Sequence, residues 1–341
     1  MYLSEEWLSY ERKLGFRPVI TGTVEEIRIG YNGLSDTIAK QLPPHDPTLT
    51  VRVFQIDDQT VSANGHEVPV RIYTPGQASE RKLPVGVYAH GGGFVAGSVQ
   101  ASFEDYNCRY IAQNTPCIIV SVDFRLAPEH PVPAQVDDVL AGFLWTRDNI
   151  TTLNGDPSKL FLIGASVGGG LALSVAVKLL EAPQGDQHAQ LAGIVALAPI
   201  TMHPEHVPAE FRPDYTAYEE NAEGPLINRA AMYVFNSLNG CDARKDDVYV
   251  FPALHPLLRA GSGSSSGSSR ELPPTFISTC GADPLRDDGT VIERALTRQG
   301  VPCRLRNYEG LPHFFWIYPE IPTGDTFRED TVEGVKFVLG V

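Results

Sequence analysis

The chain has 341 residues, 43% of them hydrophobic, which is enough for one large core or a core with a small accessory unit and is not typical of a disordered protein. Its 27 basic and 41 acidic side chains give a formal net charge of −14. Because such a field repels nucleic acids and anionic membrane surfaces, neither is an expected partner.

The first segment, residues 1–45, has a helical, amphipathic pattern that ends at Pro43 and Pro44. Its acidic start argues against a secretory signal, and no later stretch is long and apolar enough to span a bilayer. The five cysteines are scattered and lack CxxC pairing, so they are expected to be reduced and structural. We therefore expect a cytoplasmic protein.

Short strands and helices then alternate along the chain. Strands 51–56 and 68–73 alternate apolar and polar residues, as half-exposed antiparallel strands do. The next four are almost wholly apolar, which is typical of parallel strands covered on both faces. These four are 85–89, 117–122, 160–163 and 194–197, and two further strands follow at 275–280 and 302–307. Helices are predicted at 103–113, 135–149, 167–181, 287–299 and 326–338.

This alternation predicts a doubly wound α/β sheet, formed by residues 46–200 and 256–341. Residues 1–45 and 201–255 do not alternate in this way, and we expect both to form a cap, or lid, above the sheet. Residues 261–270 are almost entirely glycine and serine, so they are predicted to be a flexible loop.

A glycine-rich turn, His90-Gly91-Gly92-Gly93-Phe94, directly follows the strand 85–89. Consecutive glycines allow backbone N–H groups to approach a ligand closely. Acyl transfer needs such donors at the position of the oxyanion. The place of this turn matches the oxyanion loop of esterases and lipases.

A second signal, Gly164-Ala165-Ser166-Val167-Gly168, lies between the strand 160–163 and the helix 167–181. A serine that attacks a carbonyl must project from a sharp turn, and flanking glycines let the strand and helix approach each other. A phosphate cradle is the competing interpretation. A dinucleotide fingerprint needs glycine at Ser166, however, and a P-loop needs a terminal Gly-Lys-Ser/Thr. The pattern therefore indicates a serine hydrolase.

Four motifs occur in the order found in the hormone-sensitive-lipase family of α/β-hydrolases, which the chain resembles over roughly residues 66–317. They are His90–Phe94, 123–134, 164–169 and 281–289. The resemblance implies an α/β-hydrolase fold with an eight-stranded, mostly parallel sheet. It also implies a helical cap built from the N-terminus and an insertion after the sixth strand, and a carboxylesterase activity without a cofactor.

Ser166 needs a base to take its proton and an acid to orient that base. His313 lies in a loop after the last strand, where a side chain can reach the nucleophile, and the family's base sits in a loop of this kind. Asp283 matches the family's catalytic aspartate and gives the order Ser, Asp, His. Asp287 and Asp288 are rivals, but their spacing suits the first turn of the following helix.

The predicted oxyanion hole consists of the N–H groups of Gly92, Gly93 and Val167, with Gly91 permitting the turn. No metal is expected, because His203 and His206 lack helical ligand spacing and a third ligand nearby. The predicted substrate pocket comprises Phe94, Ala165, Phe314 and Tyr215.

Several positions depart from the family pattern. Its nucleophile turn commonly reads Gly-Asp-Ser-Ala-Gly-Gly-Asn, whereas Ala165, Val167 and Gly170 stand here. The base is usually followed by Gly-Phe, whereas Phe314 and Phe315 follow here. We expect these changes to alter rate or substrate shape without removing a triad member.

The predicted function is hydrolysis of short-chain esters, acetyl to butyryl in length, of small molecules through an acyl-serine intermediate. Residues 6–18 also resemble fungal esterases of secondary metabolism, which implies acetyl-ester cleavage on a polyketide-like alcohol. The alternatives are a biosynthetic lyase, cyclase or dehydratase, or a non-hydrolytic receptor for a small molecule. The protein is expected to be a monomer or a homodimer.

Overall fold

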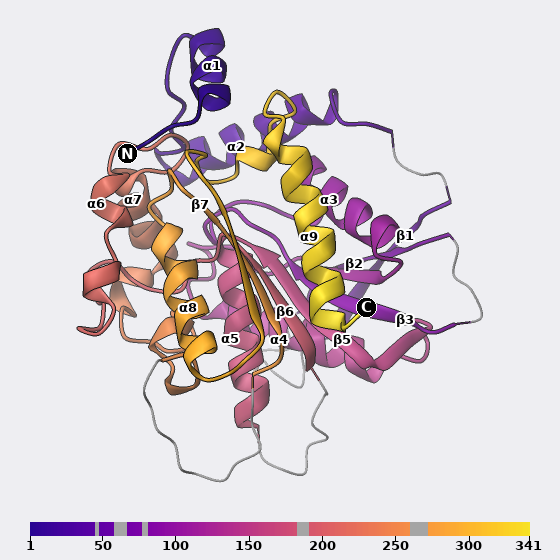
Figure 1. Ribbon diagram of the computed structural model, residues 1–341. Coiled ribbons are helices and arrows are strands. Elements are labelled where there is room, and N and C mark those ends of the chain that lie inside the picture. The colour runs from indigo at the N-terminus through magenta and orange to yellow at the C-terminus, as the bar shows by residue number, and fades with distance from the viewer. Residues whose placement is uncertain (45–47, 58–66, 77–80, 183–190, 260–271) are drawn as a thin grey trace.

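The computed structural model describes residues 1–44, 48–57, 67–76, 81–182, 191–259 and 272–341. The predicted Gly/Ser loop 261–270 lies outside these residues. An eight-stranded sheet with the order β1-β2-β4-β3-β5-β6-β7-β8 forms the centre of the molecule (Figure 1). Its strands are β1 (Thr50–Asp57), β2 (Glu67–Thr74), β3 (Leu83–Ala89), β4 (Ile118–Val122), β5 (Gly155–Ala165), β6 (Leu191–Leu197), β7 (Thr275–Cys280) and β8 (Cys303–Tyr308).

Strand directions follow the division seen in the sequence. β2 pairs antiparallel with both β1 and β4. The strands from β4 through β3, β5, β6 and β7 to β8 are all parallel. The prediction of a mostly parallel, eight-stranded α/β-hydrolase sheet is confirmed.

Helices cover both faces of the sheet, as the buried parallel strands require. The helices α4 (Ala134–Asp148), α5 (Val167–Glu181) and α8 (Arg286–Arg298) contribute buried side chains to the core on one face. The helices α3 (Ser102–Asn114) and α9 (Thr323–Leu339) do so on the other face. No helix among the described residues is both long and apolar enough to span a membrane.

Among the strands, the predicted and observed bounds differ most at β5, which was predicted at residues 160–163. This strand begins at Gly155, five residues before the apolar run, because Gly155 already pairs with Leu83 of β3. Its first half carries Asp156, Ser158 and Lys159, which are polar and outside the hydrophobic core. A search for apolar runs therefore finds only the second half of the strand.

Residues 1–45 and 201–255, which lack the alternation of strands and helices, contain the remaining α-helices. These are α1 (Glu5–Leu14), α2 (Val24–Ala39), α6 (Ala217–Glu220) and α7 (Arg229–Asn239). In Figure 1, α6 and α7 lie at the left of the molecule, α1 lies at the top, and α2 runs across the upper part. Residues 1–45 form the N-terminal segment, and residues 201–255 are called the insertion below. The two are joined through their backbones. Ile20 N–H donates to the Leu226 carbonyl, and Leu226 N–H donates to the Pro18 carbonyl, each over 2.7 Å.

Arg28 of α2 attaches this helix to the glycine-rich turn region. Its guanidinium donates to the Val95 carbonyl over 2.8 Å and to the Ala127 carbonyl over 2.9 Å. It also forms an ion pair with Glu129 at 2.7 Å. The hydrogen bonds from Arg28 lower the pKa of Glu129 to about 2. The helix α2 is thus held against the loops that follow β3 and β4 by contacts that only the folded chain creates.

Candidate active site

The predicted site residues meet at the carboxyl edge of the parallel strands. Ser166 directly follows β5, and the turn His90–Phe94 directly follows β3. Asp283 comes three residues after β7, and His313 lies in the loop after β8. Because β3, β5, β6, β7 and β8 are parallel neighbours, these loops all open on one edge of the sheet.

Ser166 occupies a strained turn with φ 58° and ψ −121°. Such a turn needs the backbones on either side to pass very close to each other. A Cβ atom at Gly164 would lie 2.3 Å from the Gly168 carbonyl oxygen, and one at Gly168 would lie 2.0 Å from the Ala89 carbonyl oxygen. Both glycines are therefore required by packing, and the turn projects the Ser166 hydroxyl from the start of α5.

A hydrogen-bonded chain links the serine, the histidine and the aspartate. His313 Nε2 lies 2.9 Å from Ser166 Oγ, and His313 Nδ1 lies 2.6 Å from Asp283 Oδ2. The other oxygen of Asp283 accepts the Leu285 N–H over 2.8 Å. Since the carboxylate accepts the Nδ1 proton, the lone pair of Nε2 faces the serine hydroxyl. All three side chains are buried.

The glycine-rich turn is anchored by a buried carboxylate, Glu104 of α3. Its Oε1 accepts the Gly91 N–H over 2.9 Å, and its Oε2 accepts the Tyr88 hydroxyl over 2.5 Å. Gly91 therefore supports the turn through its own N–H group. Within the described part of the chain, the N–H groups of Gly92, Gly93 and Val167 donate to no protein acceptor. These three groups are available to a ligand next to Ser166.

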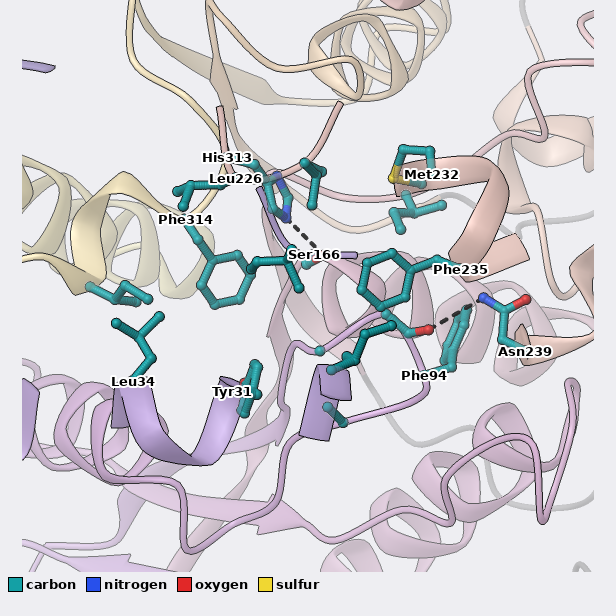
Figure 2. Close-up of a pocket in the computed structure, with 18 of the residues that line it drawn as sticks. Tyr31, Leu34, Phe94, Ser166, Leu226, Met232, Phe235, Asn239, His313 and Phe314 are labelled. Atoms are coloured by element: carbon teal, nitrogen blue, oxygen red, sulfur yellow. Dashed lines mark hydrogen bonds between the residues drawn. The ribbon is translucent and has the colours of Figure 1, made fainter. Parts of the chain in front are cut away.

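A mostly apolar cavity opens above Ser166 and His313, and Figure 2 shows its walls. The empty space between its walls, together with the open solvent at its mouth, is ≈ 780 Å³. None of the described residues that line it is Asp, Glu, Lys or Arg. One wall includes Tyr31 and Leu34 of α2, and the opposite wall includes Met232 and Phe235 of α7.

The predicted pocket residues divide into two groups. Phe94 and Phe314 line the cavity. Ala165 does not line it, because its side chain is buried in the core beneath the turn. Tyr215 does not line it either, and its hydroxyl instead donates to Asp288 over 2.7 Å.

Two aromatic rings pack directly on the glycine-rich turn. A Cβ atom at Gly91 would lie 2.3 Å from the Phe314 ring, and one at Gly93 would lie 2.5 Å from the Phe235 ring. Phe314 itself has φ 61°, a backbone conformation that favours glycine and explains why the family carries glycine there. The departure at Phe314 therefore adds an aromatic wall on one side of Ser166.

Packing accounts for two further departures from the family pattern, Val167 and Gly170. Val167 is fully buried in the core that α5 forms with the sheet, and it does not line the cavity. A side chain at Gly170 would place its Cβ atom 2.1 Å from the Ile200 carbonyl oxygen. The chain leaving β6 thus passes directly over α5, which requires glycine at this position.

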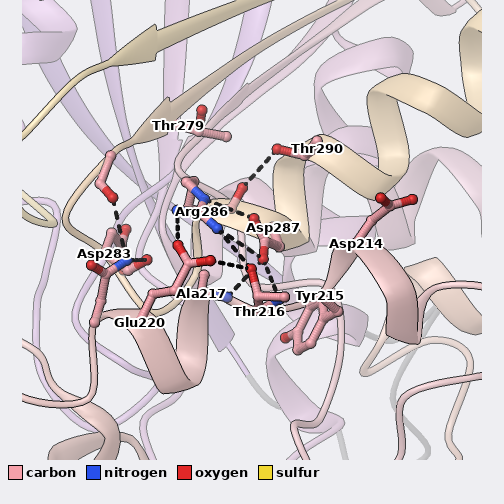
Figure 3. Close-up of polar contacts among 12 residues, drawn as sticks. Asp214, Tyr215, Thr216, Ala217, Glu220, Thr279, Asp283, Arg286, Asp287 and Thr290 are labelled. Atoms are coloured by element: carbon pink, nitrogen blue, oxygen red, sulfur yellow. Dashed lines mark hydrogen bonds and ion pairs between the residues drawn. The ribbon is translucent and has the colours of Figure 1, made fainter. Parts of the chain in front are cut away.

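Asp287 and Asp288, the rivals for the acid, bind the insertion rather than His313. Asp288 accepts the N–H groups of Thr201 and Met202, over 2.6 Å and 2.9 Å. Asp287 accepts the N–H groups of Thr216 and Ala217, both over 2.7 Å (Figure 3). Their role is structural, as predicted, but they hold distant backbone in addition to beginning α8.

The two histidines considered as metal ligands, His203 and His206, lie in different surroundings. His203 is buried and its Nε2 lies 3.1 Å from Asp242 Oδ1, while burial lowers the pKa of the ring. His206 is exposed. Among the described residues, no three His, Cys, Asp or Glu side chains are grouped so as to hold a metal ion. All five cysteines are free thiols.

Sequence reasoning missed several residues of the site, among them Glu104 and the α7 wall. Nothing in the pattern around Glu104 distinguishes it from an acid in the first turn of a helix. The sequence did contain a local signal for α7. An amphipathic stretch lies between Asn228, which caps the N-terminus of the helix, and Gly240, which caps its C-terminus.

Comparisons with known proteins agree with this geometry. Residues 86–317 match the family described as alpha/beta hydrolase fold. The chain is 33% identical over 337 residues to a versiconal hemiacetal acetate esterase of Dothistroma septosporum, covering 98% of this chain and 95% of the relative.

Two solved structures share the fold over nearly the whole chain. One is a vibralactone cyclase, with a TM-score of 0.85 and 27% identity, covering 99% of this chain and 95% of that one. The other is a hyperthermophilic esterase from the archaeon Pyrobaculum calidifontis, with a TM-score of 0.78 and 26% identity, covering 100% and 99%. With the family match and the near full-length relative, the chain belongs to the alpha/beta hydrolase fold family, as its four motifs predicted.

Proposed function

We propose that this protein hydrolyses carboxylic esters of small molecules through an acyl-Ser166 intermediate. The observation that carries the proposal is the hydrogen-bonded chain in which His313 contacts Ser166 Oγ at 2.9 Å and Asp283 at 2.6 Å. A full-length relative and a structural neighbour that are both named esterases support the same reaction.

In the first half of the reaction, Ser166 Oγ attacks the ester carbonyl while its proton passes to His313 Nε2. Asp283 holds the ring and stabilises the imidazolium. The N–H groups of Gly92, Gly93 and Val167 donate to the oxyanion. The C–O bond to the alcohol then breaks, and the alcohol leaves with the proton from His313.

Water completes the reaction. It gives a proton to His313 Nε2 as its oxygen attacks the acyl carbon, and the carboxylic acid leaves as Ser166 regains its proton. An apolar wall around the acyl group keeps other nucleophiles out. The two walls that contain α2 and α7 come from residues 1–45 and 201–255, which in this proposal form the predicted cap.

The cavity favours neutral esters with short acyl chains. None of its described lining residues is Asp, Glu, Lys or Arg, so a substrate carboxylate or ammonium would lose its hydration without an oppositely charged partner. The Dothistroma septosporum relative is named for an acetate ester. An acetyl ester of a small oxygenated alcohol is therefore the substrate class we propose.

Cyclisation is the second candidate, because the vibralactone cyclase shares the fold with a TM-score of 0.85. Both reactions can begin with the same acyl-serine. They differ in whether water or a hydroxyl group of the acyl chain attacks it. Product analysis with an ester of a hydroxy acid separates them, since hydrolysis yields the free acid and cyclisation yields a lactone.

The test of the proposed function is turnover of p-nitrophenyl acetate and butyrate by wild-type protein and two serine variants. Ser166→Ala is expected to lower kcat by about 10³-fold or more, because the nucleophile is lost. Ser174→Ala is the matched control. Ser174 is buried in the same helix, two turns beyond Ser166, and its Oγ donates to the Gly170 carbonyl over 3.0 Å. If wild type releases no nitrophenol from either ester, the proposal is wrong.

A further inference from the structure

The helix α7 presents one face to the cavity. Met232, Phe235, Asn236 and Asn239 all line it, at the three- and four-residue spacing of one helix face. Ser237, on the opposite side of the helix, is exposed. Figure 2 shows labelled members of this face, Met232, Phe235 and Asn239, across Ser166 from Tyr31 and Leu34.

The two asparagines on this face differ in their partners. Both ends of the Asn239 amide have a partner, since its Nδ2 donates to the Gly93 carbonyl over 3.3 Å and its Oδ1 accepts the Cys241 N–H over 2.9 Å. Asn236 makes no side-chain hydrogen bond to any of the residues that the structure describes, although it is only 3% exposed. Asn236 lines the cavity, and the polar atoms of its amide keep some accessible surface.

An amide in this position is less favourable when an apolar ligand fills the cavity than when the cavity is open. An apolar ligand would remove the amide from solvent without offering it a partner, which has a free-energy penalty, and asparagine is a poor residue for a helix interior. A leucine of similar size would pack against Met232 and Phe235 without either penalty. The amide is favourable in the complex when a polar group of the ligand binds it.

We infer that Asn236 is a specificity-determining residue that binds a neutral oxygen of the substrate, in addition to the ester itself. The amide offers two donors and one acceptor, so it can bind a hydroxyl group or a carbonyl oxygen. This inference rests on the proposed function and narrows it. The substrate is an ester with a second, uncharged oxygen function on the part that lies under α7.

Two matched pairs of esters test this inference. For the acyl side, p-nitrophenyl butyrate is compared with p-nitrophenyl 3-hydroxybutyrate. For the alcohol side, cyclohexyl acetate is compared with 2-hydroxycyclohexyl acetate. Each pair differs by one hydroxyl group, so the ratio of kcat/KM within a pair reports recognition of that group alone.

Asn236→Leu is expected to lower kcat/KM for the hydroxylated member of at least one pair by about 10-fold or more. The apolar member should change by less than about threefold. Ser237→Ala is the matched control on the same helix and should leave both ratios as in wild type. Asn236→Ala provides a second variant should leucine prevent folding, which the thermal unfolding midpoint reports.

The outcomes separate this inference from the proposed function. If the variants change both members of each pair equally, Asn236 acts on structure only and the inference is wrong, while ester hydrolysis stands. If wild type hydrolyses none of the four esters, the proposed function itself fails, and the inference fails with it.

Discussion

Phe314 combines a left-handed backbone with a ring that lies against the glycine-rich turn. A non-glycine residue at φ 61° carries strain of about 1 kcal/mol, and the chain retains it next to His313. The ring lines the cavity and occupies the space where a Cβ atom of Gly91 would lie. Phe314 is thus expected to limit the size of the ester on its side of Ser166.

Phe314→Gly should widen the cavity and relieve the backbone strain, at the expense of a buried aromatic side chain. We expect the ratio of kcat/KM for p-nitrophenyl 4-phenylbutyrate over p-nitrophenyl acetate to rise about 10-fold. The control is Phe315→Leu, a change in the adjacent core residue that does not line the cavity. An equal rise in the control would show that loosened packing, not cavity size, is responsible.

Asp283 is expected to act on the orientation and tautomer of His313. In Asp283→Asn the amide can face Nδ1 with its NH₂ group, which favours the tautomer that carries its proton on Nε2. That proton would face Ser166 and block its activation. We expect kcat for p-nitrophenyl acetate to fall by about 10³–10⁴-fold with little change in KM, as is typical of this substitution in serine triads. A loss below tenfold would assign the orienting role elsewhere.

At the scale of elements, α8 holds the insertion through Asp287 and Asp288. Asp288 is fully buried, and this burial raises the pKa of its carboxyl to about 7, although the hydrogen bonds from Thr201 and Tyr215 lower it. In the unfolded chain an aspartate titrates near ~3.9. Because the folded state retains the proton to a higher pH, the contribution of Asp288 to stability falls as the pH rises from about 4 to 7.

Asp288→Asn removes this titration while keeping most of the shape. The free energy of unfolding of the variant, relative to wild type, should therefore increase by more than about 1 kcal/mol between pH 5 and pH 8. Urea denaturation at the two pH values measures the difference. A constant difference between the proteins at both pH values would mean that Asp288 keeps one charge state throughout.

The elements that sequence analysis located correctly are those with a local signature. Strands buried on both faces are apolar along their length, and the sharp turns at Ser166 and Gly91 need glycines at fixed positions. Ser166, Asp283 and His313 could be proposed together because each follows a recognisable strand, and the structure places their side chains in one hydrogen-bonded chain. What could not be predicted are contacts between distant elements, such as Glu104 with Gly91 or Arg28 with Val95, because no local pattern encodes them.

At the scale of the whole molecule, the cavity is closed by walls from α2 and α7 against the sheet edge. An acyl chain that extends beyond these walls must displace packed side chains. We expect kcat/KM for p-nitrophenyl esters to be highest between acetyl and butyryl and at least about tenfold lower for dodecanoyl. Faster turnover of dodecanoyl than of butyryl esters would contradict this limit.

The separate origin of the two walls has an evolutionary consequence. One wall comes from a segment near residues 20–34 and the other from a segment near 226–241, whereas Ser166, Asp283 and His313 belong to neither. Each wall can therefore accumulate mutations, or be exchanged between relatives, while the reacting groups stay untouched. A lineage with this architecture can explore new esters one wall at a time, and a chimaera that exchanges a single wall should shift in selectivity toward its donor.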